Sequence, residues 1–447
     1  MRFALGEALA SGGRLKLKWI LVMEALLAGV YLSLTRGLFV IFMVSRGFGA
    51  WEVSAVALIS SVIAALVSIV LFRWPSLLTG RVKLKLVLFH GLERVTWFLV
   101  PVARGYAVVA ALYGVINSLP VGTLINLVIY GLLSEEDVMD LTAKRSAAFN
   151  ASTILGFTVA AGLAALLPGG EKYEYMITAG AAIGLASTML VALLDIPREI
   201  EAKPVGAERP EKVFSASYFI VAQYASANLL GIVWIPYVVN KLKAPDSLAV
   251  AMNLLGTLAS VFASLFWGRK PFSVLRLSLG MDVAAPVLAW ATPIPALHVP
   301  LSAYSSFSFT GANFIGQFLF ARYKSWLGAV RASTLAAVLG SIAQLVAAPI
   351  GLLAKENYML AFMAVSAAKV ASAVIALIAI PEVALVPEDV ARAYSLVIYE
   401  KSILGYRVSV ELSREVILTS LRLLAFAMSL LLLYVLYRVV TLTLHFS

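Results

Sequence analysis

The 447-residue sequence contains no cysteine and only three histidines, His90, His298 and His445. Without cysteine the chain has no disulfide, no thiolate metal ligand and no cysteine nucleophile. No two histidines have the spacing of a zinc-binding pair. The phosphate-binding pattern Gly-x4-Gly-Lys-Ser/Thr is also absent, which argues against ATP-driven chemistry. We therefore expect no metal, no cofactor and no enzyme activity.

Charged residues are scarce as well, at 13% of the chain, whereas apolar residues make up 61% and the mean hydropathy is +0.93. A soluble domain usually carries about a quarter charged residues. The apolar residues form runs of about twenty, long enough to cross about 30 Å of hydrocarbon as helices. The alternating segments of about ten residues that mark a β-barrel are missing. The composition predicts an all-α integral membrane protein.

Basic residues exceed acidic ones by 11 (35 minus 24), but most of them lie in short segments between the apolar runs. This pattern indicates membrane topology rather than a nucleic-acid surface, because lysine and arginine favour cytoplasmic loops. A cytoplasmic N-terminus places most basic loops on one side. An odd number of spans then places the C-terminus outside the cell membrane.

Thirteen apolar spans are predicted. They lie near residues 19–44, 52–73, 85–103, 106–132, 146–167, 174–194, 214–240, 247–267, 274–292, 297–321, 332–354, 358–380 and 419–442. A charged stretch after the sixth span divides the core. We predict an N-terminal six-helix half (1–195), a cytoplasmic linker (196–213), a C-terminal six-helix half (214–381), and an extension (382–447) with an amphipathic segment and a thirteenth membrane helix.

The two halves contain an internal repeat. At an offset of 189 residues, Gly91 aligns with Gly280 and Glu93 with Asp282, each in the third span of its half. Order, spacing and loop charge agree between the halves. The repeat predicts two pseudo-symmetric six-helix bundles, an arrangement common among transporters.

With these features, residues 15–381 resemble the major facilitator superfamily. The passage from Leu34 to Ser54, with Arg36 and a Gly-Phe turn, is similar to the exit of helix one in prokaryotic members. The family's loop motif between helices two and three is present in degenerate form at residues 79–85, without its aspartate. The resemblance implies alternating access around a cavity lined by helices one, four, seven and ten.

The missing aspartate bears on the cytoplasmic gate, which that residue helps to lock in the family. Acidic residues of the next cytoplasmic loop are positioned to replace it by pairing with basic residues of the degenerate motif. The gate candidates are Arg81, Lys83, Lys85, Glu135, Glu136, Asp137 and Asp140. The alternative is that these are solvated loop charges without a gating role.

Polar residues on the four expected lining helices are the candidates for the substrate cavity. They are Arg36, Asn117, Gln223, Asn228, Tyr304, Ser308, Asn313 and Gln317. Arg36 can hold a carboxylate or phosphate through two parallel hydrogen bonds, which favours an anionic solute. The alternative for Arg36 is an arginine that snorkels to the outer interface or pairs within the bundle.

Glu93 and Asp282 lie at matching depth in their helices, where a charge costs at least about 2.5–3.5 kcal/mol. A desolvated carboxylate there can exchange a proton, which makes these two residues candidates for proton coupling. Alternatively, Glu93 neutralises Arg94 or a base on a neighbouring helix, and Asp282 binds backbone or a loop cation. We also expect Glu24 to pair with Lys16 or Lys18 near the inner interface, and Lys369 to meet a carboxylate or carbonyls on an adjoining helix.

The sequence thus favours a secondary transporter of a small anionic solute, coupled to protons through Glu93 and Asp282. Its partners would be that solute and the lipid bilayer. The alternative is a transporter-like scaffold or complex subunit that no longer transports and binds a protein through its C-terminal helix. The lost aspartate and the additional helix favour this alternative.

Overall fold

The computed structural model describes residues 11–197, 200, 213–268, 270–355 and 357–379. The thirteenth helix, the amphipathic segment and most of the linker expected from the sequence lie outside these residues. Residues Met1–Ile375 form one compact unit, which holds both clusters of buried charge discussed below. The second unit, Ala376–Ser447, is described only through Ala379, the last residue of a helix.

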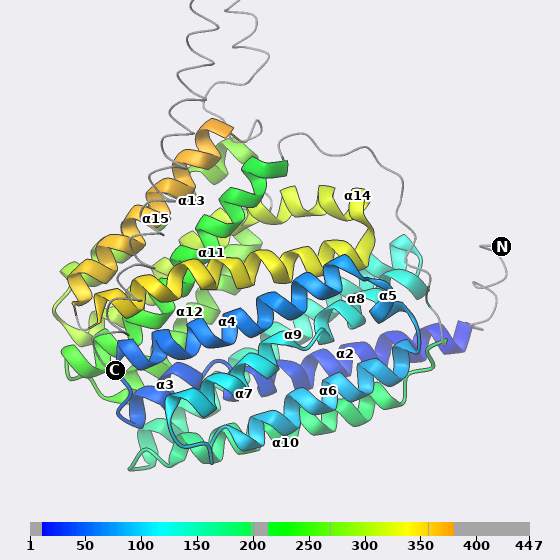
Figure 1. Ribbon diagram of the computed structural model, residues 1–447, viewed down its shortest axis with the longest axis horizontal. Coiled ribbons are helices and arrows are strands. Elements are labelled where there is room, and N and C mark those ends of the chain that lie inside the picture. The colour runs from blue at the N-terminus through cyan, green and yellow to red at the C-terminus, as the bar shows by residue number, and fades with distance from the viewer. Residues whose placement is uncertain (1–10, 198–199, 201–212, 269, 356, 380–447) are drawn as a thin grey trace, which may run out of the picture. The chain divides into compact units, whose positions relative to one another are not determined.

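Every regular element of the described chain is a helix (Figure 1). The first half contains α2 (Ser11–Leu34), α3 (Phe39–Ser45), α4 (Ala50–Arg73), α5 (Ser76–Thr79), α6 (Val82–Leu99), α7 (Tyr106–Ser118), α8 (Val121–Leu132), α9 (Glu135–Leu166) and α10 (Lys172–Ala192). The second half contains α11 (Val213–Pro236), the π-helix η1 (Tyr237–Lys241), α12 (Asp246–Trp267), α13 (Phe272–Ala291), the 3-10 helix η2 (Pro295–Leu297), α14 (His298–Ala354) and α15 (Tyr358–Ala379).

Ten spans within the described residues are long and apolar enough to cross a membrane. The third and tenth predicted spans are not among the ten, although both are helical. The third, α6, contains the charged pair Glu93 and Arg94, and the tenth, the first part of α14, is rich in serine. Both helices carry buried polar groups, among them Glu93 and Arg94 on α6 and Ser302 and Ser305 on α14.

Two predicted single spans are in fact broken helices. The first span divides into α2 and α3 at residues 35–38, and the fourth divides into α7 and α8 at Leu119 and Pro120. Leu119 has an extended backbone (φ −71°, ψ 127°), as expected for a residue that precedes proline. At the first break, the ring of Phe157 lies so close to Gly37 that a Cβ there would be 2.4 Å from Cζ of the ring. Only glycine permits this approach.

Two other boundaries were predicted wrongly. The loop expected between residues 321 and 332 is helical except for a break at Gly328, where φ is 78°. Helix α9 begins at Glu135 rather than at residue 146, because the Ser134 hydroxyl caps it by accepting a hydrogen bond from the Asp137 amide. The sequence Ser134-Glu-Glu-Asp137 is a helix-start signature that the apolar runs concealed.

The halves contact each other through equivalent helices. Helix α4, the second span of the first half, packs on α14, whose second part is the fifth span of the other half; α9, a fifth span, packs on α12, a second span. At Gly351 the contact is so close that a Cβ would be 2.3 Å from the Ser54 hydroxyl. This reciprocal pairing is the arrangement expected of two pseudo-symmetric bundles.

The halves are joined at the end of the bundle where α3 packs against α11 and α12. One apolar core there draws on both halves and includes Phe39, Trp234, Met252 and Tyr358. A second core, at the opposite end, consists among the described positions of first-half residues, Ile200 of the linker and Val330 of the second half. The two ends of the molecule therefore differ in how firmly the halves are joined.

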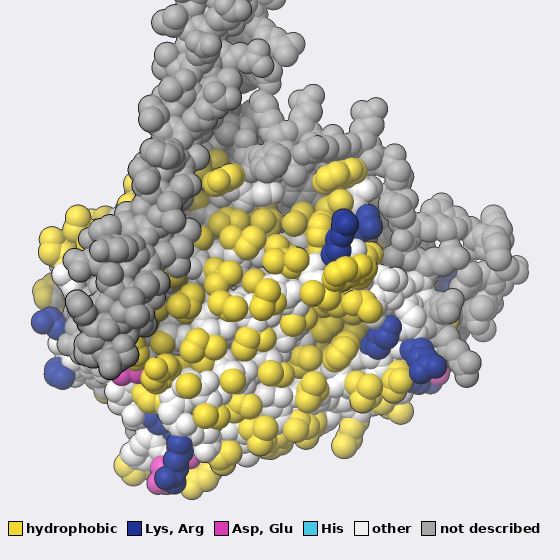
Figure 2. All heavy atoms as spheres, in the orientation of Figure 1, with side chains coloured by type: hydrophobic (Ala, Val, Ile, Leu, Met, Phe, Trp, Pro, Cys, Tyr) yellow, Lys and Arg dark blue, Asp and Glu magenta, His cyan; other side chains and the backbone are white. Residues whose placement is uncertain are grey.

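The outer surface matches a lipid environment. Figure 2 shows one face covered by hydrophobic side chains, with lysine and arginine confined to its margins. Large exposed apolar side chains include Leu66, Leu88 and Leu155, each more than half exposed. Such a face would be unstable in water and suits the hydrocarbon of a bilayer.

Close packing of α2 on α9 yields the first prediction. A Cβ at Gly29 would lie 2.4 Å from the Phe149 carbonyl oxygen and 2.9 Å from the Thr153 nitrogen, both backbone atoms. We expect Gly29→Ala to force the helices apart, to lower the free energy of unfolding by about 1–3 kcal/mol and to lower the melting temperature in detergent. Gly162→Ala on α9 is the control, because a Cβ there meets nothing within 4 Å. Equal melting temperatures for the two variants would contradict the packing.

Candidate functional site

Two cavities adjoin each other inside the molecule. One, of about 500 Å³, is lined among the described residues by the first half alone and is called the N-half pocket. The other, of about 560 Å³, lies between the halves and is called the central cavity. Arg36 lines both, and its position in the break between α2 and α3 places it where the two cavities meet.

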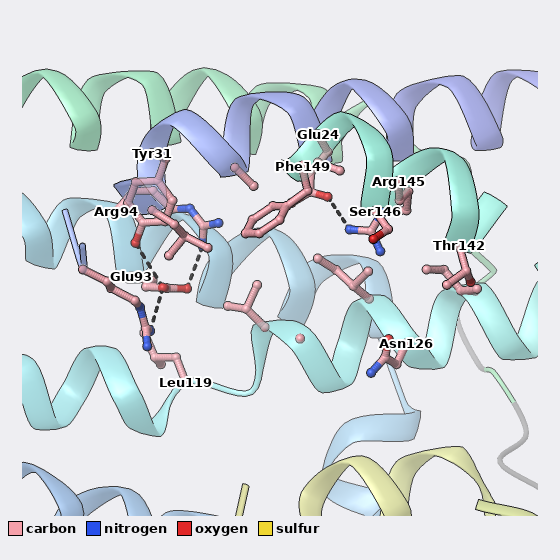
Figure 3. Close-up of a pocket in the computed structure, with 18 of the residues that line it drawn as sticks. Glu24, Tyr31, Glu93, Arg94, Leu119, Asn126, Thr142, Arg145, Ser146 and Phe149 are labelled. Carbon is pink, nitrogen blue, oxygen red and sulfur yellow. Dashed lines mark hydrogen bonds and ion pairs between the residues drawn. The ribbon is translucent and has the colours of Figure 1, made fainter. Parts of the chain in front are cut away.

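Arg36 belongs to a network of buried charge. Its Nη1 donates to the Asn117 side-chain oxygen at 2.9 Å and its Nη2 to Glu93 Oε1 at 3.0 Å. The other Glu93 oxygen accepts from Arg94 at 2.7 Å, and the Tyr31 hydroxyl donates to Oε1 at 3.0 Å. Figure 3 shows Tyr31, Glu93 and Arg94 converging. Glu93 therefore neutralises Arg94 and also a base on another helix, as one reading of the sequence expected.

The same bond joins the two broken helices. Arg36 lies in the break of the first span, and Asn117 lies two residues before the break of the fourth, at Leu119. Irregular backbone is tolerated at membrane depth where it is enclosed by protein or lines a cavity. Here it does both.

The second half holds a matching cluster. The Asp282 carboxylate on α13 forms an ion pair with Lys369 on α15 and accepts a hydrogen bond from Gln223 Nε2 on α11 at 2.8 Å. The Gln223 oxygen in turn accepts from Ser372 at 2.9 Å. All four residues are buried. The expectation that Lys369 meets a carboxylate on an adjoining helix is confirmed.

Both repeat-related carboxylates thus neutralise a cation that lines the central cavity. Glu93 holds Arg36, and Asp282 holds Lys369. Arg36 is the more accessible of the two, with 37% of its side chain exposed against 1% for Lys369. Its Nε also has no hydrogen-bond partner within the described part of the chain.

The structure places the predicted cavity residues in different surroundings. Arg36 and Asn228 line the central cavity, and Asn117 and Gln223 support the two clusters. The Tyr304 hydroxyl instead donates to the Met281 carbonyl at 3.0 Å, and Ser308 bonds its own helix at the Ser305 carbonyl. Neither is among the described residues that line the central cavity. Asn313 is not among the lining residues either, and the side chain of Gln317 lies outside the described set.

The central cavity has further polar and aromatic lining residues besides the candidates. On α12 they are Asn253, Thr257 and Ser260, and on α14 they are Ser302, Ser305, Ser306, Phe309 and Thr310. Both sets follow the i, i+3/i+4, i+7 spacing of one helix face. Applying that periodicity to the serine-rich span would have excluded Tyr304 and Ser308, which belong to the opposite face.

The acidic gate candidates lie in the first turns of α9, not in a loop. Asp137 and Asp140 pair with Lys18 on α2, at 2.5 and 3.3 Å, and Asp140 also pairs with Lys144. The expected pairing of these acids with Arg81, Lys83 and Lys85 is therefore wrong for this conformation.

The remaining gate candidates lie near the start of α6 or α9. Arg81 is the N-cap of α6, with φ at 50°, and the Lys85 ammonium donates to the Leu77 carbonyl at 2.7 Å. Lys83 and Glu136 form no ion pair within the described residues; Glu135 begins α9, and its side chain is outside the described set.

Glu24 also has a different partner from the one expected. Arg145 on α9 donates to Glu24 Oε2 at 2.6 Å, and His90 Nε2 lies 3.6 Å from Oε1. Lys16 pairs instead with Asp195, and Lys18 with the acids of α9. The expectation failed because Arg145 is 121 positions away in sequence and reaches Glu24 only through the packing of α2 on α9. Among the described residues, no three histidine, aspartate or glutamate side chains gather as a metal site would require.

The cluster around Asp282 yields the second prediction. Lys369→Met leaves a buried carboxylate without its cation, and we expect a loss of about 3–5 kcal/mol of unfolding free energy, measured as a lower melting temperature in detergent. Lys241→Met, at an exposed position, is the control. The double variant Lys369→Met/Asp282→Asn should recover part of the loss, since it removes both charges. A double variant less stable than Lys369→Met would rule out the pairing.

No protein-family model matches the sequence, and no curated protein matches it significantly. Solved structures do match. A D-xylose–proton symporter shares 16% identity at a TM-score of 0.58, with 83% of this chain and 98% of that chain covered. A bacterial homologue of the iron transporter ferroportin, in an inward-facing state, shares 13% identity at a TM-score of 0.59 over 81% and 98%. The nucleoside transporter NupG shares 14% at 0.57 over 81% and 97%. The chain therefore has the fold of the major facilitator superfamily transporters.

Proposed function

We propose that this protein is a secondary transporter that moves a small anionic organic solute by alternating access, with the central cavity as its binding site. The observation that carries the proposal is the accessible Arg36 guanidinium in a cavity enclosed by both halves. The shared fold with sugar–proton, nucleoside and iron transporters supports the transport class, while those solutes are too different to indicate the substrate.

The walls of the central cavity favour an organic solute. Tyr113, Trp234 and Phe309 supply aromatic surface, and Asn228 and Asn253 supply amides. A volume of about 560 Å³ lies within the range of small-molecule sites. An anionic group on the solute would face Arg36, whose side chain is 37% exposed and lines the cavity.

Alternating access requires contacts between the halves that form at one end of the molecule and then break so that this end can open. At the end where α3 packs against α11 and α12, Lys172 on α10 and Asp246 on α12 join the halves with an ion pair of 3.2 Å. Asn253 adds a hydrogen bond of 2.8 Å to the Gly37 carbonyl in the broken first helix. Polar contacts of this kind exchange with water more readily than packed apolar surfaces, and they provide a gate that can open.

Proton coupling is assigned to Glu93 and Asp282. Each is held by a cation that lines the cavity, so a bound anion that draws Arg36 or Lys369 toward itself weakens the hold on the carboxylate. A carboxylate that loses its cation in a dry interior is stabilised by binding a proton. Solute binding and proton binding would then favour each other.

The third prediction tests the site. Purified protein is screened for thermal stabilisation by a panel of carboxylates, phosphate monoesters, sugars and nucleosides, and hits are tested for uptake into liposomes. We expect anionic hits, and we expect Arg36→Ala to raise the half-saturating concentration roughly 10- to 100-fold, because a charge-assisted contact is lost. Arg104→Ala, in an exposed loop, should change nothing. If no solute stabilises the protein or enters liposomes and a protein co-purifies stoichiometrically, a scaffold role replaces transport.

The fourth prediction tests coupling. Glu93→Gln retains hydrogen bonding but cannot be ionised. We expect accumulation of the solute driven by a pH gradient to be lost, while exchange of labelled for unlabelled solute at equal concentrations continues. Exposed Glu171→Gln is the control and should retain both activities. Gradient-driven uptake that survives in Glu93→Gln would remove Glu93 from the coupling mechanism.

A further inference from the structure

The N-half pocket differs from the central cavity in the elements that build it. All of its lining residues fall between Glu24 and Phe149, on α2, α6, α8 and α9 or in the short segments that adjoin them. Within the described part of the second half, no residue contributes to this lining. The pocket is therefore a chamber of one bundle, connected to the central cavity at Arg36.

The pocket has two charged ends with an apolar wall between them. Glu93 and Arg94 gather around Tyr31 at one end, and Glu24 pairs with Arg145 at the other. Glu24 and Tyr31 are seven residues apart on α2, or about 10 Å along the helix. Figure 3 shows the ring of Phe149 between the two ends. Apolar residues complete the middle of the wall: Ala28, Leu32, Val121, Ile125 and Ile129.

The charges that line the pocket do not balance. Three guanidinium groups, of Arg36, Arg94 and Arg145, face two carboxylates, of Glu24 and Glu93. An excess of one positive charge among the described lining residues favours a bound anion.

Arg145 is placed to bind that anion. Its Nη2 donates to Glu24 at 2.6 Å and its Nε to the Leu21 carbonyl at 3.1 Å, while its Nη1 has no hydrogen-bond partner among the described residues. One fifth of its side chain is exposed, and the pocket includes Arg145 in its lining. Ser146 and Thr142, also in the lining, add hydroxyl groups beside it.

We propose that the N-half pocket is a second solute site, which binds an organic monoanion with an apolar body, and that Arg145 binds its carboxylate or phosphate. The body lies along the Phe149 wall. The proposal rests on the transport function proposed above, because the second site would bind the transported anion next to Arg36 along the same transport path. Helix α8, which forms part of the pocket wall, also contacts the other half, because Asn126 donates to Ser333 at 3.2 Å. Binding in the pocket therefore affects a contact between the halves.

The natural absence of cysteine permits a direct test. Ser146→Cys places a single thiol in the N-half pocket, and Asn228→Cys places one in the central cavity. Each purified variant is labelled with N-ethylmaleimide in the presence of benzoate, an organic monoanion, or benzamide, its neutral counterpart. We expect benzoate to slow labelling of Ser146→Cys at least threefold and benzamide to leave it unchanged.

Variants at Arg145 identify the binding group. In Ser146→Cys, adding Arg145→Gln should abolish protection by benzoate, whereas adding exposed Arg104→Gln should not. Arg145→Gln leaves Glu24 unpaired, so Arg145→Gln/Glu24→Gln, which removes both charges, is tested beside it and should also lose protection. Equal protection by benzamide, or protection that persists without Arg145, would overturn the proposal.

Failure of this proposal can be told apart from failure of transport. Labelling reports binding and needs no solute movement. Benzoate protection of Ser146→Cys in a protein that moves no solute would leave the site standing and remove the transport role. Uptake of an anion without protection at Ser146→Cys would support the transport role and remove the second site.

Discussion

The structure depends on how it accommodates the Glu93 carboxylate in the interior of a membrane protein. A lone charge at that depth is strongly unfavourable, so it must be paired and hydrogen-bonded. Glu93 accepts from Arg36, Arg94 and Tyr31, and Arg36 continues the network to Asn117. These bonds tie the first, third and fourth spans together. The second half solves the same problem with Asp282, Lys369 and Gln223.

The network also lies where the backbone departs from regular helix. Both broken spans of the first half meet at the bond between Arg36 and Asn117. Breaking a helix frees backbone groups, which need partners in a medium without water. The Gly37 carbonyl finds one in Asn253 of the other half. A break needed to position one arginine thus becomes part of the joint between the halves.

The two cavities differ in which halves of the molecule line them. The central cavity is shared by the halves, whereas the N-half pocket belongs to one bundle, and Arg36 belongs to both. Every carboxylate that lines either cavity, or supports its lining cation, is already paired with a base. An anion that binds in either cavity therefore competes with these carboxylates for the cations that they already pair with. That competition is the physical basis on which solute and proton binding can be linked.

The sequence by itself determined the membrane class, the ten membrane spans found among the described residues, the division into two related halves, and the match of Glu93 with Asp282. These follow from composition and periodicity, which are properties of one segment at a time. It also predicted that Lys369 would meet a carboxylate, because a buried ammonium must. Only the tertiary structure decided which carboxylate.

The partners of Glu24, Asp137 and Asp140 came from helices far away in sequence, and the lining face of the serine-rich span depended on which side α14 presents to α12. Pairing between helices is set by packing. Small residues such as Gly29 permit that packing through close contacts with another helix, and the sequence of one helix does not show such contacts.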